Sequence, residues 1–476
     1  MADDGSGSSR EGHHHFLIVV YGIQSHINPA RALAHRLTRL GVAGSIRATL
    51  CLSVSSHRRM FPSSNGAGET TDGVISYTPY CDGLDENSLP KSDDEERARC
   101  RRVGFESLSS VIGSLAARGL PVTRVMCTMV LPAVLDVSLE LGIPLVVYWI
   151  QPAHVLTAYF YYFHGYGDLI ASHVATDPAQ EVSLPGLTRP VRVGDLPSFL
   201  VDTSGSELTR IFKETMRELF EFVDRQRPKL LVNTFEGLEP AVLADMKRHL
   251  DVFVVGPMVG SSTEARVHLF KHDDVDRKRY MDWLDAQPEE SVVYVSFGSI
   301  SKYKKQQMEE IVEGLKQCGR PYLLVARKDG FEDDMMDYVF ESTVKDQGIV
   351  VDWCNQLEVL SHAAVGCFVT HCGWNSTLEA VASGVPIIGV PNMFVDQPIN
   401  AYLVEEEWLI GTKVERDSEG ILTRKELARC IELVMGEGAK ANDIRERTKA
   451  LKRLAQEAAV VGGHADRNLL HFVKTI

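Results

Sequence analysis

The stretch CFVTHCGWNSTLEAV, residues 367–381, contains the elements that decide the fold. CFVT is a short apolar run typical of a buried strand, HCGW forms a tight turn, and the pattern from Asn375 onward predicts the start of a helix. A strand that leads through a tight turn into a helix is half of the unit from which parallel sheets are built. The free N–H groups and the positive dipole end of such a helix make its start a candidate anion site.

Further strands alternate with helical patterns on both sides of this stretch. In the first half, FLIVVY at 16–21 predicts a strand, and Asn28-Pro29 then opens a helix with Pro at its first position. Other strands are predicted at 47–54, 123–128, 144–149, 230–233, 292–297, 322–326, 348–351 and 386–390. This alternation predicts an α/β fold with two doubly wound, parallel sheets.

The turn-rich segment 255–262, VGPMVGSS, is the predicted junction between two domains, residues 1–255 and 256–455. A charged loop follows it to about Lys278. The helical pattern of 445–476 is interrupted at Gly462-Gly463.

Composition excludes several classes of protein. A chain of 476 residues with 44% hydrophobic residues is large enough for two cores. Its net charge of −14 argues against general binding to nucleic acid or anionic membranes. Nine scattered cysteines, an odd number without any C-x-x-C pair, predict reduced thiols and a cytoplasmic location. We expect no signal peptide and no membrane-spanning segment. Neither a G-x-G-x-x-G nor a Walker-type phosphate loop is present.

Polar and aromatic residues gather at the expected carboxyl ends of the later strands, where ligands bind in open α/β sheets. Trp353 follows one strand and offers a ring for stacking on a base, although a core Trp at a strand end is the better explanation when this residue is taken alone. Asn375 and Ser376 add donors to the helix start, and His371 can donate to a phosphate oxygen. A plain helix cap explains Asn375 or Ser376, but not His371 and Gly373 beside them.

Three acidic or amide side chains extend this candidate site. Glu379 lies one helical turn after Asn375, where a carboxylate can accept from ribose hydroxyls; alone it is read as a solvated charge. The pair Asp396-Gln397 supplies acceptors and a donor amide that suit vicinal sugar hydroxyls. Ser299 follows another strand and can donate to a diphosphate.

The ordered series WCNQ (353–356), HCGWNSTLE (371–379) and DQ (396–397) resembles the donor box of plant family-1 UDP-sugar glycosyltransferases. The resemblance implies the GT-B arrangement of two facing Rossmann-like domains. The N-terminal domain then binds the acceptor, the C-terminal domain binds UDP-glucose, and a last helix at about 456–476 packs back on the N-terminal domain. The box runs over 45 residues from Trp353 to Gln397, one more than is usual in that family.

The same resemblance assigns roles to individual residues. It implies that the Trp stacks on uracil, the His and the Asn-Ser pair hold the diphosphate, the Glu takes the ribose, and the Asp-Gln pair takes a sugar that is glucose. The implied donor-site residues are Ser299, Trp353, Cys354, Gln356, His371, Gly373, Trp374, Asn375, Ser376, Glu379, Asp396 and Gln397.

On the acceptor side, His26 is expected in the turn between the first strand and the first helix, where the family has its general base. Ser25 replaces the Gly that usually precedes this His. A His that only caps the helix start is the alternative. Thr128 stands where many members have an Asp that orients the base, so it can hydrogen-bond the imidazole but cannot stabilise an imidazolium as a carboxylate does. Such a site suits an acidic acceptor, a phenol with a pKa of about 10 or a carboxylic acid with a pKa of about 4.

The sequence therefore predicts inverting, metal-independent O-glucosylation of a small plant phenol such as a flavonoid by a monomeric enzyme. UDP-glucose is a substrate, and no cofactor is expected. Three alternatives stay open: glucose-ester formation, C-glucosylation, and a non-catalytic nucleotide-sugar-binding homologue. Asp274-Val275-Asp276 resembles a metal-nucleotide motif, but its place in a predicted charged loop favours solvated charges. The aromatic run 157–164 fits a core helix and an aromatic acceptor pocket equally well.

Overall fold

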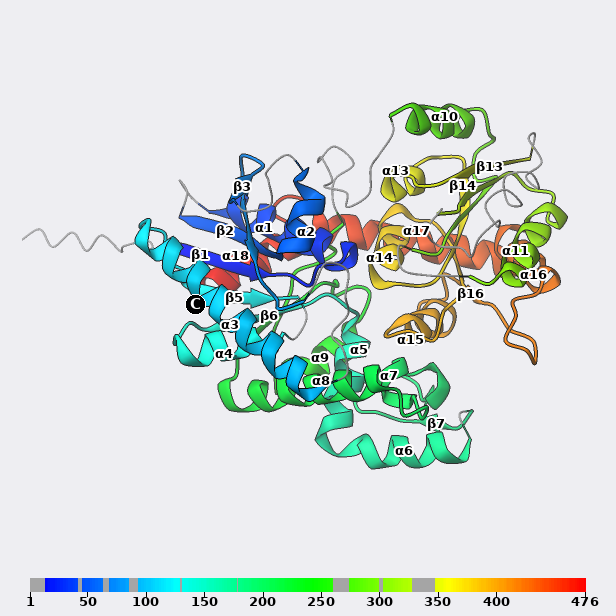
Figure 1. Cartoon of the computed structure of the whole chain (residues 1–476). Coiled ribbons are helices and arrows are strands. Elements are labelled where there is room, and N and C mark those ends of the chain that lie inside the picture. Colours follow the sequence, from blue (N-terminus) through cyan, green and yellow to red (C-terminus); the bar gives the residue numbers. More distant parts are fainter. Residues whose placement is uncertain are drawn as a thin grey trace, which may run out of the picture. The chain divides into compact units, whose positions relative to one another are not determined.

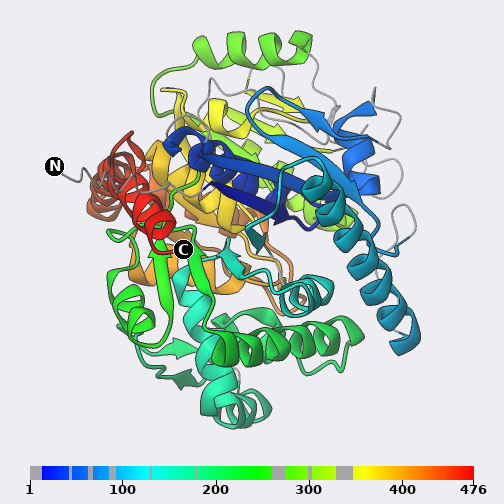
Figure 2. The same ribbon diagram turned by 90° about the vertical axis from the view of Figure 1, so that its left-hand side faces the viewer.

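The structure is a computed structural model that describes residues 13–41, 45–62, 68–84, 93–128, 131–177, 179–259, 274–298, 303–327 and 347–476. Figures 1 and 2 show the chain in two views related by a 90° rotation. It divides into two compact units, one of Met1–Tyr148, Glu221–Leu231 and Leu469–Ile476 and one of Trp149–Phe220 and Val232–Asn468. Both units are discontinuous in sequence, so the predicted domain boundary at residue 255 remains a prediction.

The first sheet has eight strands in the order β10-β9-β6-β5-β1-β2-β4-β3. β1 runs parallel to β2 and β5, and Val19 at the end of β1 lies opposite Cys127 at the end of β5. These strands are parallel because a helical connection returns the chain to the end of the sheet where the previous strand began. Its strands are β1 (His14–Val19), β2 (Ile46–Ser53), β3 (Thr70–Thr71), β4 (Ser76–Tyr80), β5 (Arg124–Cys127), β6 (Leu145–Trp149), β9 (Lys229–Val232) and β10 (Asp251–Val254).

The second sheet has six strands in the order β13-β12-β11-β14-β15-β16, and every neighbouring pair is parallel. The chain winds from β11 through β12 to β13, then returns to the other side of β11 with β14. The order therefore reverses between β11 and β14, a topological switch point of the kind where ligands bind. The strands are β11 (Val292–Ser296), β12 (Tyr322–Val325), β13 (Gly348–Val351), β14 (Val365–Thr370), β15 (Ile387–Gly389) and β16 (Gly411–Lys413).

Amphipathic helices accompany both sheets, and strand pairs that are parallel and joined by helices confirm the predicted α/β class. One pair differs, since β3 runs antiparallel to β4. The N-terminal helices are α1 (Gln24–Leu40), α2 (Val54–Met60), α3 (Asp94–Ala117) and α4 (Pro132–Glu140). The middle of the chain holds α5 (Ala153–Tyr161), η3 (Tyr162–Tyr166), α6 (Gly167–Thr176), the hairpin β7 (Glu181–Val182) with β8 (Val191–Arg192), η4 (Val193–Asp195), α7 (Ser198–Val201), α8 (Glu207–Gln226) and α9 (Pro240–His249). The later helices are α10 (Asp274–Asp285), α11 (Lys305–Gln317), α13 (Gln356–Leu360), α14 (Trp374–Ser383), α15 (Gln397–Tyr402), η6 (Leu403–Glu407), α16 (Arg424–Met435), α17 (Ala439–Ala459) and α18 (His464–Lys474).

The start of α1 differs from the sequence prediction. The helix begins at Gln24, so Pro29 lies inside it and His26 lies in its first turn. The N–H groups of His26 and Ile27 both donate to the carbonyl of Ile23, which makes this segment helical before the proline. Pro29 forfeits one main-chain hydrogen bond, a cost that the buried apolar face of α1 offsets.

The C-terminal helical pattern is interrupted where the sequence predicted. α17 ends at Ala459, and α18 begins at His464, after Gly462 and Gly463. The ring of Phe472 in α18 lies 6.0 Å from that of Phe16 in β1, and both rings are fully buried. The last residues of the chain therefore contribute to the core beneath β1.

Candidate active site

The start of α14 presents main-chain donors without a side-chain cap. Gly373 is the N-cap residue and makes no side-chain capping bond, while Asn375 and Ser376 follow as the second and third residues of the helix. The alternative reading of Asn375 or Ser376 as a plain N-cap is therefore wrong. Because the first N–H groups of a helix have no partner within it, the start of α14 offers donors and a positive dipole end to an anion.

His371, between β14 and α14, is enclosed by two glycines. A Cβ at Gly298 would lie 2.6 Å from His371 Cε1, and a Cβ at Gly373 would lie 2.5 Å from Nε2. The imidazole position therefore requires glycine on both sides. The preceding strands are in register, with Ser296 of β11 opposite Thr370 of β14. This register brings the ends of both strands level at the switch point.

Burial lowers the pKa of His371 to about 4, so its imidazole is neutral at pH 7. Its Nδ1 lies 3.4 Å from the hydroxyl oxygen of Thr370. A neutral ring carries one N–H, so it can serve as a hydrogen-bond donor without adding a full charge. Cys372, between His371 and Gly373, adopts a left-handed φ of 61°, a strained conformation that is common at functional sites.

Three polar side chains of the predicted donor site contact one another. The amide Nε2 of Gln356 donates to Ser376 Oγ at 2.9 Å and to Glu379 Oε2 at 2.8 Å. Ser376 and Glu379 are both buried. Gln356 thus ties the start of α13 to one face of α14 and fixes the Glu379 carboxylate in place.

Three other predicted donor-site residues, Trp353, Cys354 and Trp374, differ in whether their side chains are accessible to a ligand. Trp353 is half-buried just after β13, at the predicted strand end. The thiol of Cys354 points to the hydroxyl of Tyr294 at 3.3 Å, and the indole N–H of Trp374 donates to the carbonyl of Asn233 at 2.8 Å. Since these side chains of Cys354 and Trp374 are buried and occupied, they leave only their main chains for a ligand.

Asp396 and Gln397 are both buried at the start of α15. Burial raises the pKa of Asp396 to about 6, and the hydrogen bond from Asn400 partly opposes this rise. The Asn400 amide also donates to the carbonyl of Cys372 at 2.8 Å. Asn400 thereby ties Asp396 to the turn before α14. Sequence reasoning missed Asn400, although its position four residues after Asp396 on a helix was a usable signal.

Gln397 is oriented by its own loop. Its Oε1 accepts from the main-chain N–H of Asn392 at 3.0 Å, which leaves the amide NH₂ as the donor end. This bond closes the loop between Asn392 and Gln397.

In the first unit, His26 and Thr128 are in direct contact. His26 Nδ1 lies 3.1 Å from Thr128 Oγ1, across the carboxyl ends of β1 and β5. Burial lowers the pKa of His26 to about 4. With Nδ1 engaged by the threonine, Nε2 is the nitrogen free to take a proton from an acceptor. The sequence predicted His26 in the connection between the first strand and the first helix. In the structure His26 lies within the first turn of helix α1, close to the carboxyl end of β1.

Comparisons with known proteins match this arrangement. The family described as UDP-glucoronosyl and UDP-glucosyl transferase matches residues 261–448. Crocetin glucosyltransferase, chloroplastic, of Gardenia jasminoides is 38% identical over 474 residues, covering 97% of both chains. Phloretin 4'-O-glucosyltransferase of Malus domestica is 38% identical over 485 residues, covering 97% of this chain and 98% of its own. The chain belongs to the UDP-glycosyltransferase family.

A solved structure agrees with the assignment to this family. The crystal structure of Os79 from O. sativa in complex with UDP superposes with a TM-score of 0.79 at 30% identity, covering 97% of this chain and 99% of that one. The predicted GT-B class and the prediction of a glycosyltransferase are therefore confirmed. Over the described part of this glycosyltransferase, every helix is too short or too polar to cross a lipid bilayer.

Two predictions for this glycosyltransferase fall at or beyond the limits of the described residues. Ser299 lies outside them, although Gly298 before it is described, with a φ of 79°. The Asp274–Asp276 motif was expected in a loop, but it lies in the first turn of α10, and Asp276 pairs with Arg279 at 3.3 Å. Acidic residues favour the positive end of a helix, which explains why this charged segment is helical.

The aromatic run at 157–164 is largely core. Tyr159, Phe160 and Tyr161 are buried, and the hydroxyl of Tyr161 donates to Asp245 at 2.7 Å. Tyr159 differs, because its buried hydroxyl has no partner among the described residues. Burial and then the charge of Asp396 raise the pKa of Tyr159. This tyrosine of α5 therefore lies near the predicted sugar site, a placement that the sequence did not indicate.

Proposed function

We propose that this UDP-glycosyltransferase transfers glucose from UDP-glucose to the hydroxyl oxygen of a small phenol, with inversion and without a metal ion. The contact between His26 and Thr128 carries the proposal, because it pairs a neutral base with a hydroxyl instead of a carboxylate. The relative named for the 4'-oxygen of phloretin supports oxygen as the acceptor atom.

The proposed donor site uses the carboxyl edge of the second sheet. Trp353 stacks on uracil, Glu379 accepts from the ribose, and His371, Asn375, Ser376 and the start of α14 donate to the diphosphate. Fixed donors aimed at oxygens where negative charge develops stabilise the departing UDP. Asp396 and the amide end of Gln397 take the hydroxyls of glucose.

The proposed reaction is a single displacement. The acceptor oxygen forms a bond to the anomeric carbon of glucose while the bond from that carbon to the UDP oxygen breaks, so the configuration inverts. His26 Nε2 takes the phenolic proton, and UDP leaves with the electron pair of the broken bond. A base whose pKa is about 4 gives little driving force for deprotonating an alkyl alcohol. A phenol, with a pKa of about 10, is a much stronger acid, so its proton is transferred to His26 more easily.

Glucose-ester formation is the second candidate, and the same contact supports it. A carboxylic acid with a pKa of about 4 arrives ionised and needs no base. The two functions therefore differ in their dependence on His26. We further propose a monomer in the cytosol; the name of the Gardenia relative makes the chloroplast the alternative location.

The test is an acceptor screen with UDP-glucose, read by mass spectrometry and by UDP release, in the presence and absence of EDTA. We expect O-glucosides of phenols, which are stable to alkali and are cleaved by acid at the glycosidic bond, with equal rates in EDTA. An alkali-labile glucose ester as the main product would favour the second candidate. No UDP release with any acceptor would favour a non-catalytic homologue.

A further inference from the structure

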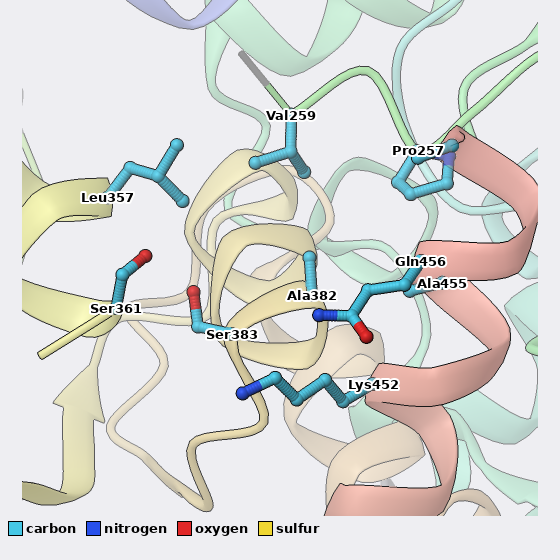
Figure 3. Close-up of a pocket in the computed structure, with 10 residues that line it drawn as sticks. Pro257, Val259, Leu357, Ser361, Ala382, Ser383, Lys452, Ala455 and Gln456 are labelled. Carbon is cyan, nitrogen blue, oxygen red and sulfur yellow. The ribbon is translucent and has the colours of Figure 1, made fainter. Parts of the chain in front are cut away.

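A cavity of about 320 Å³ lies within the second unit (Figure 3). Its wall is formed by the end of α14, by α13, by α17 and by the segment at Pro257 and Val259. The apolar lining is Pro257, Val259, Leu357, Ala382, Ala455 and Ala459. The lining contains none of the predicted donor-site residues, although Leu357 directly follows Gln356 in the chain. Asn375 and Ser376 lie at the start of α14, whereas Ala382 and Ser383 line the cavity from its end.

Four polar side chains also line the cavity: Ser361, Ser383, Lys452 and Gln456. Figure 3 shows the amino group of Lys452 and the amide of Gln456 extending from α17 toward the end of α14. Among the described residues, the structure gives none of these four side chains a hydrogen-bond or ion-pair partner. They are exposed to solvent in the cavity and remain available to a ligand.

Lys452 is held so that its charge faces this space. A Cβ at Gly384, the C-cap of α14, would lie 2.7 Å from Lys452 Cδ, so the stem of the lysine packs on the helix end. Glu358 of α13, which follows the lining residue Leu357, already pairs with Arg277, so it does not neutralise Lys452. The lysine also offsets the negative end of the α14 dipole. The interaction with the helix dipole requires the charge of Lys452 but does not explain the apolar cavity beside it.

We propose that this cavity binds a small monocarboxylate with an apolar body. The lysine, the two serine hydroxyls and the amide supply the donors that a carboxylate accepts, and the alanines, Leu357 and Val259 cover the hydrocarbon part. A single cation beside the carboxyl end of a helix disfavours phosphates and other dianions. The volume holds about ten non-hydrogen atoms, the size of octanoate, since each water in the liquid takes about 30 Å³.

The experiment titrates octanoate into the intact enzyme saturated with UDP, using NMR to follow both the ligand and the protein. Ligand efficiency for this size predicts a dissociation constant of about 1 mM. We expect one octanoate per chain, binding at least about fivefold more tightly than neutral 1-octanol, and no displacement by a phenolic acceptor. Equal binding of 1-octanol, or displacement by the acceptor, would overturn the proposal.

Variants locate the site. Lys452→Met removes the charge and keeps the stem, and we expect octanoate affinity to fall about fivefold, with recovery in Lys452→Arg. Ala382→Leu fills the cavity from α14 and should abolish binding. The control is Arg453→Met, an exposed neighbour on α17 outside the cavity lining. Thermal midpoints and UDP affinity equal to wild type establish that each variant is folded. Unchanged octanoate binding in both Lys452→Met and Ala382→Leu would refute the site.

Discussion

His26 and His371 occupy similar positions in the two sheets but have different surroundings. Each follows a parallel strand, each contacts a threonine hydroxyl through Nδ1, and burial lowers the pKa of each to about 4. His371 lies between two glycines at an uncapped helix start, whereas His26 lies in the first turn of α1 with the ring of Tyr21 5.6 Å away. Protonation therefore does not distinguish their roles; the surroundings of each ring do, because His371 lies between two glycines beside the start of α14.

The largest expected effect tests His26 as the base. His26→Ala should lower turnover on a phenol by about 10²–10⁴-fold, the usual contribution of general-base catalysis, and leave UDP affinity unchanged. Turnover by mass spectrometry and UDP binding by calorimetry measure the two quantities. Ser25→Ala, an exposed neighbour, is the control. Near-full turnover of His26→Ala would remove His26 from the mechanism.

The next effect tests the enclosure of His371. Gly373 has a φ of −62°, which alanine adopts without strain, so Gly373→Ala adds only a methyl group against His371 Nε2. We expect displacement of the imidazole and a loss of UDP affinity of roughly tenfold to a hundredfold, the range for one hydrogen bond to a charged group. Gly438→Ala is the matched control, since a Cβ there meets nothing within 4 Å. Equal UDP affinity in both variants would contradict the phosphate role of His371.

A third effect concerns Asp396, which has no counterpart at the His26 site. Because burial raises its pKa to about 6, the carboxylate is ionised above that pH and becomes protonated as the pH falls through it. UDP-glucose affinity should therefore fall about tenfold between pH 7 and pH 5, because the diphosphate of UDP-glucose carries the same charge at both pH values while Asp396 becomes protonated. Asp396→Asn should bind UDP-glucose weakly at both pH values. A pH dependence that persists in this variant would assign the titration to another group.

The smallest effect is expected when a carboxylate replaces the hydroxyl beside His26. In Thr128→Asp, a negative charge beside His26 favours the imidazolium and should raise the pKa of His26 by about one to three units. In a plot of turnover against pH, the fall in rate on the acidic side then moves to higher pH, because His26 becomes protonated at a higher pH. Turnover on alkyl alcohols should rise several-fold relative to phenols, because the base is stronger. Thr128→Ser keeps the hydroxyl and serves as the control; an unchanged pH dependence of turnover in Thr128→Asp would show that Thr128 does not tune the base.

Much of the second sheet was predictable from local pattern. The strands at 292–296, 322–325 and 348–351 coincide with the predicted runs to within one residue, because buried parallel strands are continuous apolar segments. Short or edge strands were missed, such as β4 at 76–80 and β16 at 411–413. Pro79 within β4 and the three-residue length of β16 give little periodic signal. The start of α1 was misplaced because Pro29 is a stronger helix-start signal than the polar residues before it.

The sequence alone determined which chemical groups are present and which strand ends they follow. The order of Trp353, His371, Asn375 and Asp396 along the chain is sufficient to recognise the donor box without a structure. Only the tertiary structure decided how those groups are used. It placed Thr128 against His26, closed two glycines around His371, directed the indole of Trp374 into the core and linked Asp396 to the α14 turn through Asn400. These contacts join residues from different strands and helices, so they depend on strand order and register, which no local pattern of side chains encodes.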